Sequence, residues 1–335
     1  MIAPRPATSM RYSVAGRTVL IDAYDEWSAQ AVFSLFSGWF LSPISESDNE
    51  NPDLTLRIHC GTVPDLVPPE CTSFSIALGG ICHTDNQRYF IEFHNSLITF
   101  GPGTLSEVDL WVNQPYEVNS SVVAQLISHA LSPGLRRCGV FELHSAGVVA
   151  PKSSKAIVFA GPSGSGKSTL TSQLASNGWG YLSDDILMLR ERDQEVEVSA
   201  FRRFFALTDE TIAAVNLPGV TSNSIGKKRV TPQDHFQANL IQQATAGTLI
   251  FPSITKETRS RLMRLNPATA MSRLIRLCPW ASYDKPTSTE HLRILGTLAN
   301  STTSFDLLAG RDILKSPQQA AELILNATSE LAPVV

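Results

Sequence analysis

Short runs of alternating apolar and polar residues, separated by turn signals, occupy the first third of the chain. Alternation with a period of two is typical of strands that bury one face. Residues 26–40 instead repeat their apolar positions at helical spacing, and residues 42–53 have the Ser, Asn, Asp, Glu and Pro content of a surface loop. This part therefore predicts a small α+β domain, with strands at residues 11–23, 54–59, 74–78, 88–93 and 97–100.

The pattern changes after a second predicted helix, residues 120–131, which we expect to end at a Ser-Pro-Gly sequence. Short, strongly apolar strands followed by glycine-rich turns come next. Residues 156–160 are a continuous apolar run, as expected for a strand that is buried on both faces of an α/β sheet. We predict two domains: a smaller N-terminal α+β domain at residues 1–125, which could take part in substrate recognition, and an α/β domain at residues 126–335.

Composition excludes several classes of protein. A chain of 335 residues with 43% hydrophobic and 17% charged residues is long enough for two globular domains. Its net charge of -4 provides no excess of positive charge for binding nucleic acid or an anionic membrane. Its five cysteines are not spaced as metal ligands. The N-terminus has no signal-peptide apolar core, and the most apolar stretch, residues 31–44, is too short to span a bilayer. We expect a cytoplasmic protein without nucleic-acid or membrane partners.

Residues 161–168 match the P-loop pattern G-x-x-x-x-G-K-[ST], between the predicted buried strand and a predicted helix at residues 168–176. The glycines let backbone N–H groups turn inward around an anion, and the helix N-terminus adds partial positive charge. Lys167 should reach the β- and γ-phosphates of ATP, and the Ser168 hydroxyl should bind Mg²⁺. The alternative is a glycine-rich turn without a nucleotide. The predicted nucleotide-binding residues here are Gly161, Ser163, Gly164, Ser165, Gly166, Lys167, Ser168 and Thr169.

Two adjacent aspartates, Asp184 and Asp185, lie in an otherwise apolar segment soon after Lys167. A P-loop requires an acid at the end of a neighbouring strand to hold its metal, and adjacent carboxylates are costly to bury without a cation or donor. Consecutive strand residues face opposite sides, so both can serve one site only if the strand bends or ends here. The alternative is one Mg²⁺ ligand and one solvated turn residue. Upstream, His144 is either an ordinary surface or core histidine whose hydrogen bonds are satisfied, or a catalytic residue.

In this order and at these separations, His144, the P-loop and Ser183-Asp184-Asp185 resemble the C-terminal domain of the HPr kinase/phosphorylase family. The resemblance extends to HPr-kinase-like relatives that phosphorylate a serine of precursor peptides such as lasso peptides. It covers residues 135–210 well and leaves the N-terminal half uncovered.

The resemblance implies an α/β P-loop kinase domain of the HPr kinase/phosphoenolpyruvate carboxykinase type. It further implies that Lys167 and Ser168 hold phosphates and Mg²⁺ with Asp184 as a second metal ligand. His144 would lie near the transferred group, and Asp185 is our preferred base for the serine proton. The implied partner is a peptide or small protein, either a precursor peptide or one like HPr, and homo-oligomer formation is left open.

The region after the aspartates departs from the bifunctional enzymes of the family, which carry a metal-binding Glu and a phosphate-gripping Arg-Gly there. In this chain Glu195 or Glu197 would take the place of the metal-binding Glu, and Arg202 or Arg203 would bind phosphate. The departure weakens the case for HPr as the substrate and for phosphorolysis as a second activity. A basic segment, residues 225–230, either is a solvated surface or binds phosphate or an acidic peptide through Lys227, Lys228 and Arg229.

Beyond the basic segment, residues 249–252 and the following Arg259 and Arg261 are similar to a strand and an Arg-bearing stretch of those relatives. Residues 270–277 and 318–331 fit amphipathic helices that serve packing.

The sequence thus favours an ATP- and Mg²⁺-dependent kinase that transfers the γ-phosphoryl group to a serine hydroxyl. Two alternatives stay open: a P-loop ATPase or nucleotide-dependent switch, and a small-metabolite kinase of the same fold. The paired aspartates, and the lack of a separate Gln or Arg-finger signature for positioning water, favour the kinase over the switch.

Overall fold

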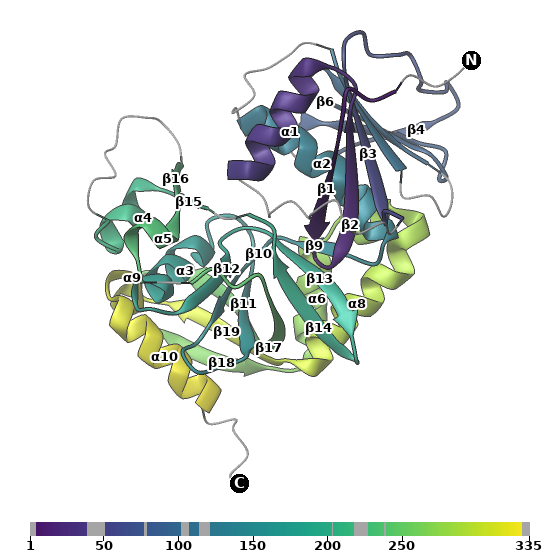
Figure 1. Cartoon of the computed structure of the whole chain (residues 1–335). Helices are drawn as coiled ribbons and strands as arrows, with labels where there is room; N and C mark the ends of the chain where they lie inside the picture. The colour runs from purple at the N-terminus through teal and green to yellow at the C-terminus, as the bar shows by residue number, and fades with distance from the viewer. Residues whose placement is uncertain are drawn as a thin grey trace. The chain divides into compact units, whose positions relative to one another are not determined.

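The computed structural model divides the chain into two compact units of mixed α/β structure (Figure 1). The described residues are 5–38, 51–76, 79–101, 107–113, 121–202, 204–217, 227–237 and 239–329. Unit 1 comprises residues 1–141 and 284–289, and unit 2 comprises residues 142–283 and 290–335. The boundary that the sequence suggested, at residue 125, lies inside helix α2 (Ser121–Arg137), and all of this helix belongs to unit 1.

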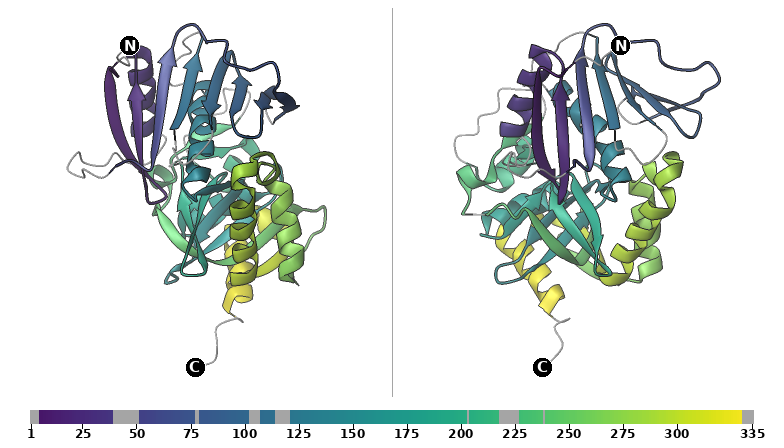
Figure 2. Two further views of the ribbon diagram at one scale, coloured as in Figure 1. Left: turned by 90° about the vertical axis from the view of Figure 1, so that its right-hand side faces the viewer. Right: turned by 45° about the vertical axis from the view of Figure 1, so that its right-hand side comes forward.

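Unit 1 is built on one mixed sheet with the strand order β1-β2-β3-β8-β7-β6-β5-β4. Helices α1 (Glu26–Gly38) and α2 pack on one face of it (Figure 2). The strands are β1 (Thr8–Val14), β2 (Arg17–Ala23), β3 (Leu54–Cys60), β4 (Thr72–Ser75), β5 (Ile81–Thr84), β6 (Tyr89–Phe93), β7 (Ser96–Phe100) and β8 (Glu107–Val112). The predicted strands 54–59, 88–93 and 97–100 and the helix from residue 26 to 38 are confirmed, whereas β5 and β8 were not predicted. Residues 39–50 lie outside the described part of the chain.

Residues 11–23 are not the single strand that the sequence predicted. They contain most of a hairpin, in which β1 and β2 are joined by Ala15 and Gly16. Both turn residues have positive φ, 49° and 71°, as the tight turns of hairpins require. Alanine rarely adopts this conformation, and for that reason the turn has no strong sequence signal.

Helix α2 also differs from the prediction, because it continues through Pro133 to Arg137 rather than ending at residue 131. Proline in a helix interior removes a hydrogen bond and is normally unfavourable. Tertiary contacts favour the longer helix here. An added Cβ at Gly134 would lie 2.2 Å from Leu54, so the glycine allows close packing on β3, and the last turn carries two arginines that a buried acid binds.

That acid is Asp284, which is fully buried in unit 1. Its carboxylate accepts hydrogen bonds from Arg136 Nε at 2.9 Å and from both terminal nitrogens of Arg137 at 3.0 and 3.1 Å. The next residue, Lys285, donates its backbone N–H to the Tyr89 hydroxyl at 3.1 Å. These bonds join a short segment from late in the sequence to the helix and sheet of unit 1.

Unit 2 is built on a larger mixed sheet with the path β12-β10-β11-β17-β14-β13-β9, to which β19 is added beside β17 and β18 beside β19. Its strands are β9 (Phe141–Leu143), β10 (Ser145–Val149), β11 (Lys155–Ala160), β12 (Gly180–Ser183), β13 (Leu187–Arg192), β14 (Glu195–Ala200), β17 (Gln243–Ile254), β18 (Arg261–Leu265) and β19 (Thr303–Ala309). A separate two-stranded sheet pairs β15 (Phe205–Leu207) with β16 (Lys228–Val230). The predicted strand 249–252 lies within β17.

The helices after α2 are α3 (Lys167–Ser176), α4 (Asp209–Ala214), α5 (Pro232–His235), α6 (Pro267–Leu277), α7 (Trp280–Tyr283), α8 (Ser288–Ser301), α9 (Arg311–Lys315) and α10 (Pro317–Ser329). One apolar core joins α3, α9 and α10 to β10, β11, β17 and β19. The predicted buried strand 156–160 and the predicted helices near residues 168–176, 270–277 and 318–329 are confirmed. Within the described ranges, none of the helices has the length and apolar composition needed to cross a membrane.

One edge of the unit 2 sheet gathers the ends of several strands. β11, β17 and β19 run parallel to one another, while β10 is antiparallel to both β11 and β12. The carboxyl ends of β12, β11, β17 and β19 and the start of β10 therefore lie along the same edge. In sheets of this kind, ligands commonly bind at the carboxyl ends of the parallel strands.

Candidate functional site

A glycine-rich loop, residues 161–166, connects β11 to α3 at this edge. Gly164 and Gly166 have φ of 81° and 99°, a conformation that other residues rarely adopt. A Cβ at Gly161 would lie 2.9 Å from Ser165 Oγ. No side chain caps α3 at its first residue, so the N–H groups of its first turn remain available to an anion.

Lys167 opens α3, and its side chain turns back over the loop. Its Nζ donates to the carbonyl oxygens of Gly161 at 2.7 Å and Pro162 at 3.1 Å, and it lies 3.0 Å from His144 Nε2. Burial, and then the charge of Lys227, lower the pKa of Lys167 to about 8, although Asp184 opposes the change. The ammonium group is thus held between the loop and His144, where it can bind an incoming phosphate.

The two aspartates lie at a bend between β12 and β13. β12 ends at Ser183, whose hydroxyl accepts the N–H groups of Asp185 and Ile186, both at 3.2 Å. The chain therefore leaves the strand at the aspartates. This meets the condition under which the two carboxylates can serve one site.

Asp184 is buried with only one of its carboxylate oxygens satisfied. Oδ2 accepts the Ala206 N–H at 2.9 Å, while Oδ1 is buried without a hydrogen-bond partner among the described residues. The hydroxyl of Ser168 is close by, since it donates to the backbone oxygen of Asp184 at 3.2 Å. An unsatisfied buried carboxylate oxygen is costly unless a cation or donor meets it.

Asp185 has different partners. Its carboxylate contacts His144 Nδ1 at 3.1 Å and pairs with the guanidinium of Arg202. A chain of polar contacts thus runs from Lys167 through His144 and Asp185 to Arg202. The predicted Arg202 therefore lies beside the aspartates, whereas the predicted Arg203 lies outside the described residues.

The partners of His144 indicate a neutral imidazole. Burial first, and then the charges of Lys167, Lys227 and Arg202, together lower its pKa to about 4, with Asp184 opposing them. Because Nε2 faces an ammonium donor and Nδ1 faces a carboxylate, we assign the proton to Nδ1. His144 thereby links the acid and the lysine without adding a positive charge.

We expect the His144 imidazole to remain neutral as the pH falls from 8 to about 5, with a midpoint near pH 4. Its contribution to stability is complete above the ordinary pKa of 6.5 and is lost between pH 6.5 and 4, because the unfolded chain binds the proton first. NMR of ¹⁵N-labelled histidine would measure the midpoint. In a Lys167→Met variant the midpoint should rise but stay below 6.5, since burial is the larger cause. A midpoint near 6.5 in the wild-type protein would contradict this description of the site.

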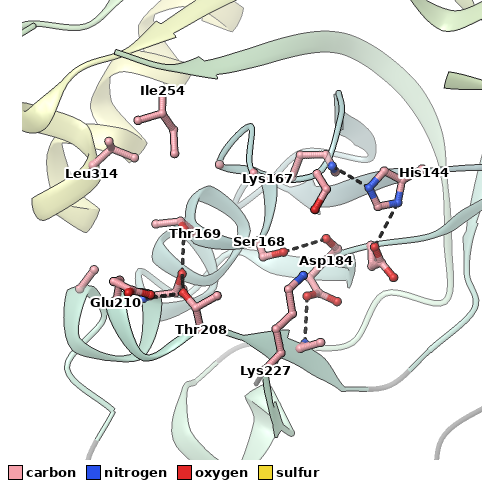
Figure 3. Close-up of a pocket in the computed structure, with 17 residues that line it drawn as sticks. His144, Lys167, Ser168, Thr169, Asp184, Thr208, Glu210, Lys227, Ile254 and Leu314 are labelled. Atoms are coloured by element: carbon pink, nitrogen blue, oxygen red, sulfur yellow. Dashed lines mark hydrogen bonds and ion pairs between the residues drawn. The ribbon is translucent and has the colours of Figure 1, made fainter. Parts of the chain in front are cut away.

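These groups line a cavity of about 480 Å³ (Figure 3). The predicted residues that line it are His144, Ser163, Gly164, Gly166, Lys167, Ser168, Thr169, Asp184, Asp185 and Lys227. Gly161 and Ser165 shape the loop but do not line the cavity. The lining residues that the sequence reasoning missed are Ala206, Thr208, Glu210, Thr211, Ala214, Ile254 and Leu314.

The structure does not bring Glu195 or Glu197 to this cavity. Glu195 pairs with Lys155 at 2.9 Å, at the opposite end of β11 from the glycine-rich loop, and Glu197 pairs with Arg190 at 3.0 Å. Neither carboxylate can replace the metal-binding Glu of the bifunctional family. Of the basic segment, Lys227 lines the cavity, while Lys228 pairs with Asp209.

Some of the missed residues had a readable signal. Thr208 caps α4 by accepting the Thr211 N–H, and a Thr before an acidic first turn is a recognisable helix start. Thr211 in turn lies 2.8 Å from Thr169, oxygen to oxygen. Ile254, in contrast, had no such signal. It ends a strand that runs parallel to β11, but the residues around it give no indication of a site.

The oxygens available at the cavity suit a magnesium ion. Asp184 Oδ1 and the Ser168 hydroxyl are hard oxygen ligands, and Mg²⁺ at phosphate sites uses one or two protein oxygens together with phosphates and water. No group of three or more His, Cys, Asp or Glu residues that could hold a metal occurs in the described part of the chain.

No family model and no curated protein matches the sequence. Among solved structures, the chain is similar to the Hpr(Ser) kinase/phosphatase from Coxiella burnetii. The identity is 14%, the match covers 57% of this chain and 97% of the other, and the TM-score is 0.31.

Proposed function

We propose that the protein is an ATP- and Mg²⁺-dependent kinase that transfers the γ-phosphoryl group to a serine hydroxyl of a peptide or small protein. One observation carries the proposal: the glycine-rich loop at the start of α3 and the aspartates after β12 meet in a single cavity. A phosphate cradle and a pair of carboxylates are the two parts that phosphoryl transfer to a hydroxyl requires.

The loop end of the cavity would bind the donor. The N–H groups of the loop and of the first turn of α3 would surround the phosphates, with Lys167 on the β- and γ-phosphates. Asp184 Oδ1 and the Ser168 hydroxyl would hold Mg²⁺, which neutralises charge on the phosphates when bound. On binding, the phosphates would replace the carbonyl oxygens that now accept from Lys167.

The Asp185 end would bind the acceptor. The serine oxygen would form a bond to the γ-phosphorus as the bond to the bridging β–γ oxygen breaks, and the serine proton would pass to the Asp185 carboxylate. An aspartate is a weak base, which suffices because the transition state is loose and depends mainly on positioning and charge neutralisation. His144 and Arg202 would hold the carboxylate in place through the contacts described above.

The test is to incubate the protein with γ-labelled ATP, Mg²⁺ and, in separate reactions, HPr and any short peptide encoded beside its gene, and to locate the label by mass spectrometry. We expect label on a serine, and loss of about 10²–10³-fold in rate for Lys167→Ala, which removes a donor to the transferred phosphate. Free phosphate released at the same rate with and without acceptors would instead identify an ATPase or switch.

A further inference from the structure

Ile254 is an apolar side chain that is half exposed, at 51% of its full accessibility, and it lines the cavity. It is the last residue of β17 and pairs with Ala309 at the end of β19. A Cβ at Gly166 would lie 3.3 Å from Ile254 Cγ1, so the side chain lies directly against the glycine-rich loop. Leu314 lines the same cavity from α9, the helix that follows β19.

The order of strands fixes which residues lie on each side of the loop. Along the shared edge the sequence of strands is β12, β10, β11, β17, β19. The groups that they carry there are, in the same order, the aspartates, His144, the glycine-rich loop, Ile254 and Leu314. The acids and the apolar pair are therefore on opposite sides of the loop, and Figure 3 shows Ile254 and Leu314 across Lys167 from His144.

The reactive end of a bound nucleotide is set by the charged groups. Lys167 Nζ lies 3.0 Å from His144, and Asp184 and Asp185 lie on that same side. A γ-phosphate must face these groups to be transferred, so the remainder of the nucleotide extends toward the other side. Ile254 and Leu314 line the cavity on that side, and their apolar surfaces match the flat apolar face of a purine.

Resting on the proposed kinase function, we infer that Ile254 and Leu314 form the subsite that receives the adenine base of the donor nucleotide. Leu314 is positioned by its helix, because its backbone oxygen accepts from Gln173 of α3 at 2.9 Å and its side chain packs against the core. Ile254 is free of such packing on its exposed half, and a bound base would cover that half. The exposed isoleucine is thus a binding surface and not a packing defect.

The test compares two ligands in the presence of Mg²⁺: ATP, which has a base, and inorganic tripolyphosphate, which has none. Isothermal titration calorimetry would give the Kd of each for the wild-type protein and for Ile254→Ser. We expect the Kd for ATP to rise at least about fivefold, from the loss of apolar contact, and that for tripolyphosphate to change less than about twofold. Ile254→Met, which keeps an apolar side chain, should retain most of the ATP affinity.

A matched control is Ile275→Ser on α6, an isoleucine with 38% exposure that does not line the cavity; it should change neither Kd. Equal weakening of both ligands by Ile254→Ser would overturn the subsite, because the residue would then act through the loop. An effect on the KM of the peptide acceptor alone would overturn it as well. Wild-type protein that binds tripolyphosphate but not ATP would refute the subsite, whereas wild-type protein that binds neither would refute the proposed function too.

Discussion

Asp185→Asn is expected to slow phosphoryl transfer about 10²–10⁴-fold, the range typical for removal of a general base. The amide keeps the size of the carboxylate but cannot take the serine proton. ATP affinity should be largely unchanged, because Asp185 contacts His144 and Arg202 and makes no hydrogen bond to the glycine-rich loop. Single-turnover kinetics would measure the transfer rate, and calorimetry the Kd for ATP.

A suitable control for Asp185→Asn is Asp193→Asn. Asp193 is an exposed residue in the turn between β13 and β14, with φ of 52°, a conformation that asparagine tolerates well. This variant should keep full activity. If Asp185→Asn weakens ATP binding as much as Lys167→Ala does, the assignment of Asp185 as the base is refuted.

Asp284→Asn should lower the free energy of unfolding of unit 1 by about 3–5 kcal/mol, because removing one partner of a buried ion pair leaves an uncompensated buried charge. Here two arginines depend on the same fully buried carboxylate, and Arg136 is itself only 2% exposed. Hydrogen exchange of the α2 amides would report the change for unit 1 separately from unit 2.

The control for Asp284→Asn is Glu107→Gln, which breaks an ion pair with Arg57 at the surface of the same sheet. Exposed ion pairs contribute about 0–1 kcal/mol, so this variant should unfold almost as the wild-type protein does. Similar effects of the two substitutions would contradict the structural role that we assign to Asp284.

The loop end of the site could be predicted from the sequence because its determinants are local. Positive φ at Gly164 and Gly166, the preceding buried strand and the start of α3 all fall within a few residues of Lys167. The aspartates were predicted from the length of one helix and one strand. The bend that brings both to the site depends on the Ser183 hydroxyl, a contact that the sequence does not reveal.

The part of the cavity formed by Ile254 and Leu314 could not be predicted, because the order of the strands in the sheet brings these residues to the loop. Ile254 and Leu314 reach the loop only because β17 and β19 lie beside β11, and no local pattern specifies that arrangement. Glu195 and Glu197 were misplaced for the same reason: β14 directs both to ion pairs with other residues. In unit 1, α2 passes Pro133 because Asp284, far away in sequence, binds its last turn.

The late position of Asp284 also has a consequence for how the chain is made. Almost all of unit 1 has been synthesised at Phe141. Asp284, which pairs with the two arginines of α2, is added about 140 residues later. At about 5–20 residues per second, the ribosome takes roughly 7–30 s to cover that distance. Throughout this interval the nascent N-terminal sheet holds two arginines without their acid, so the final structure of α2 must wait for synthesis to pass residue 284.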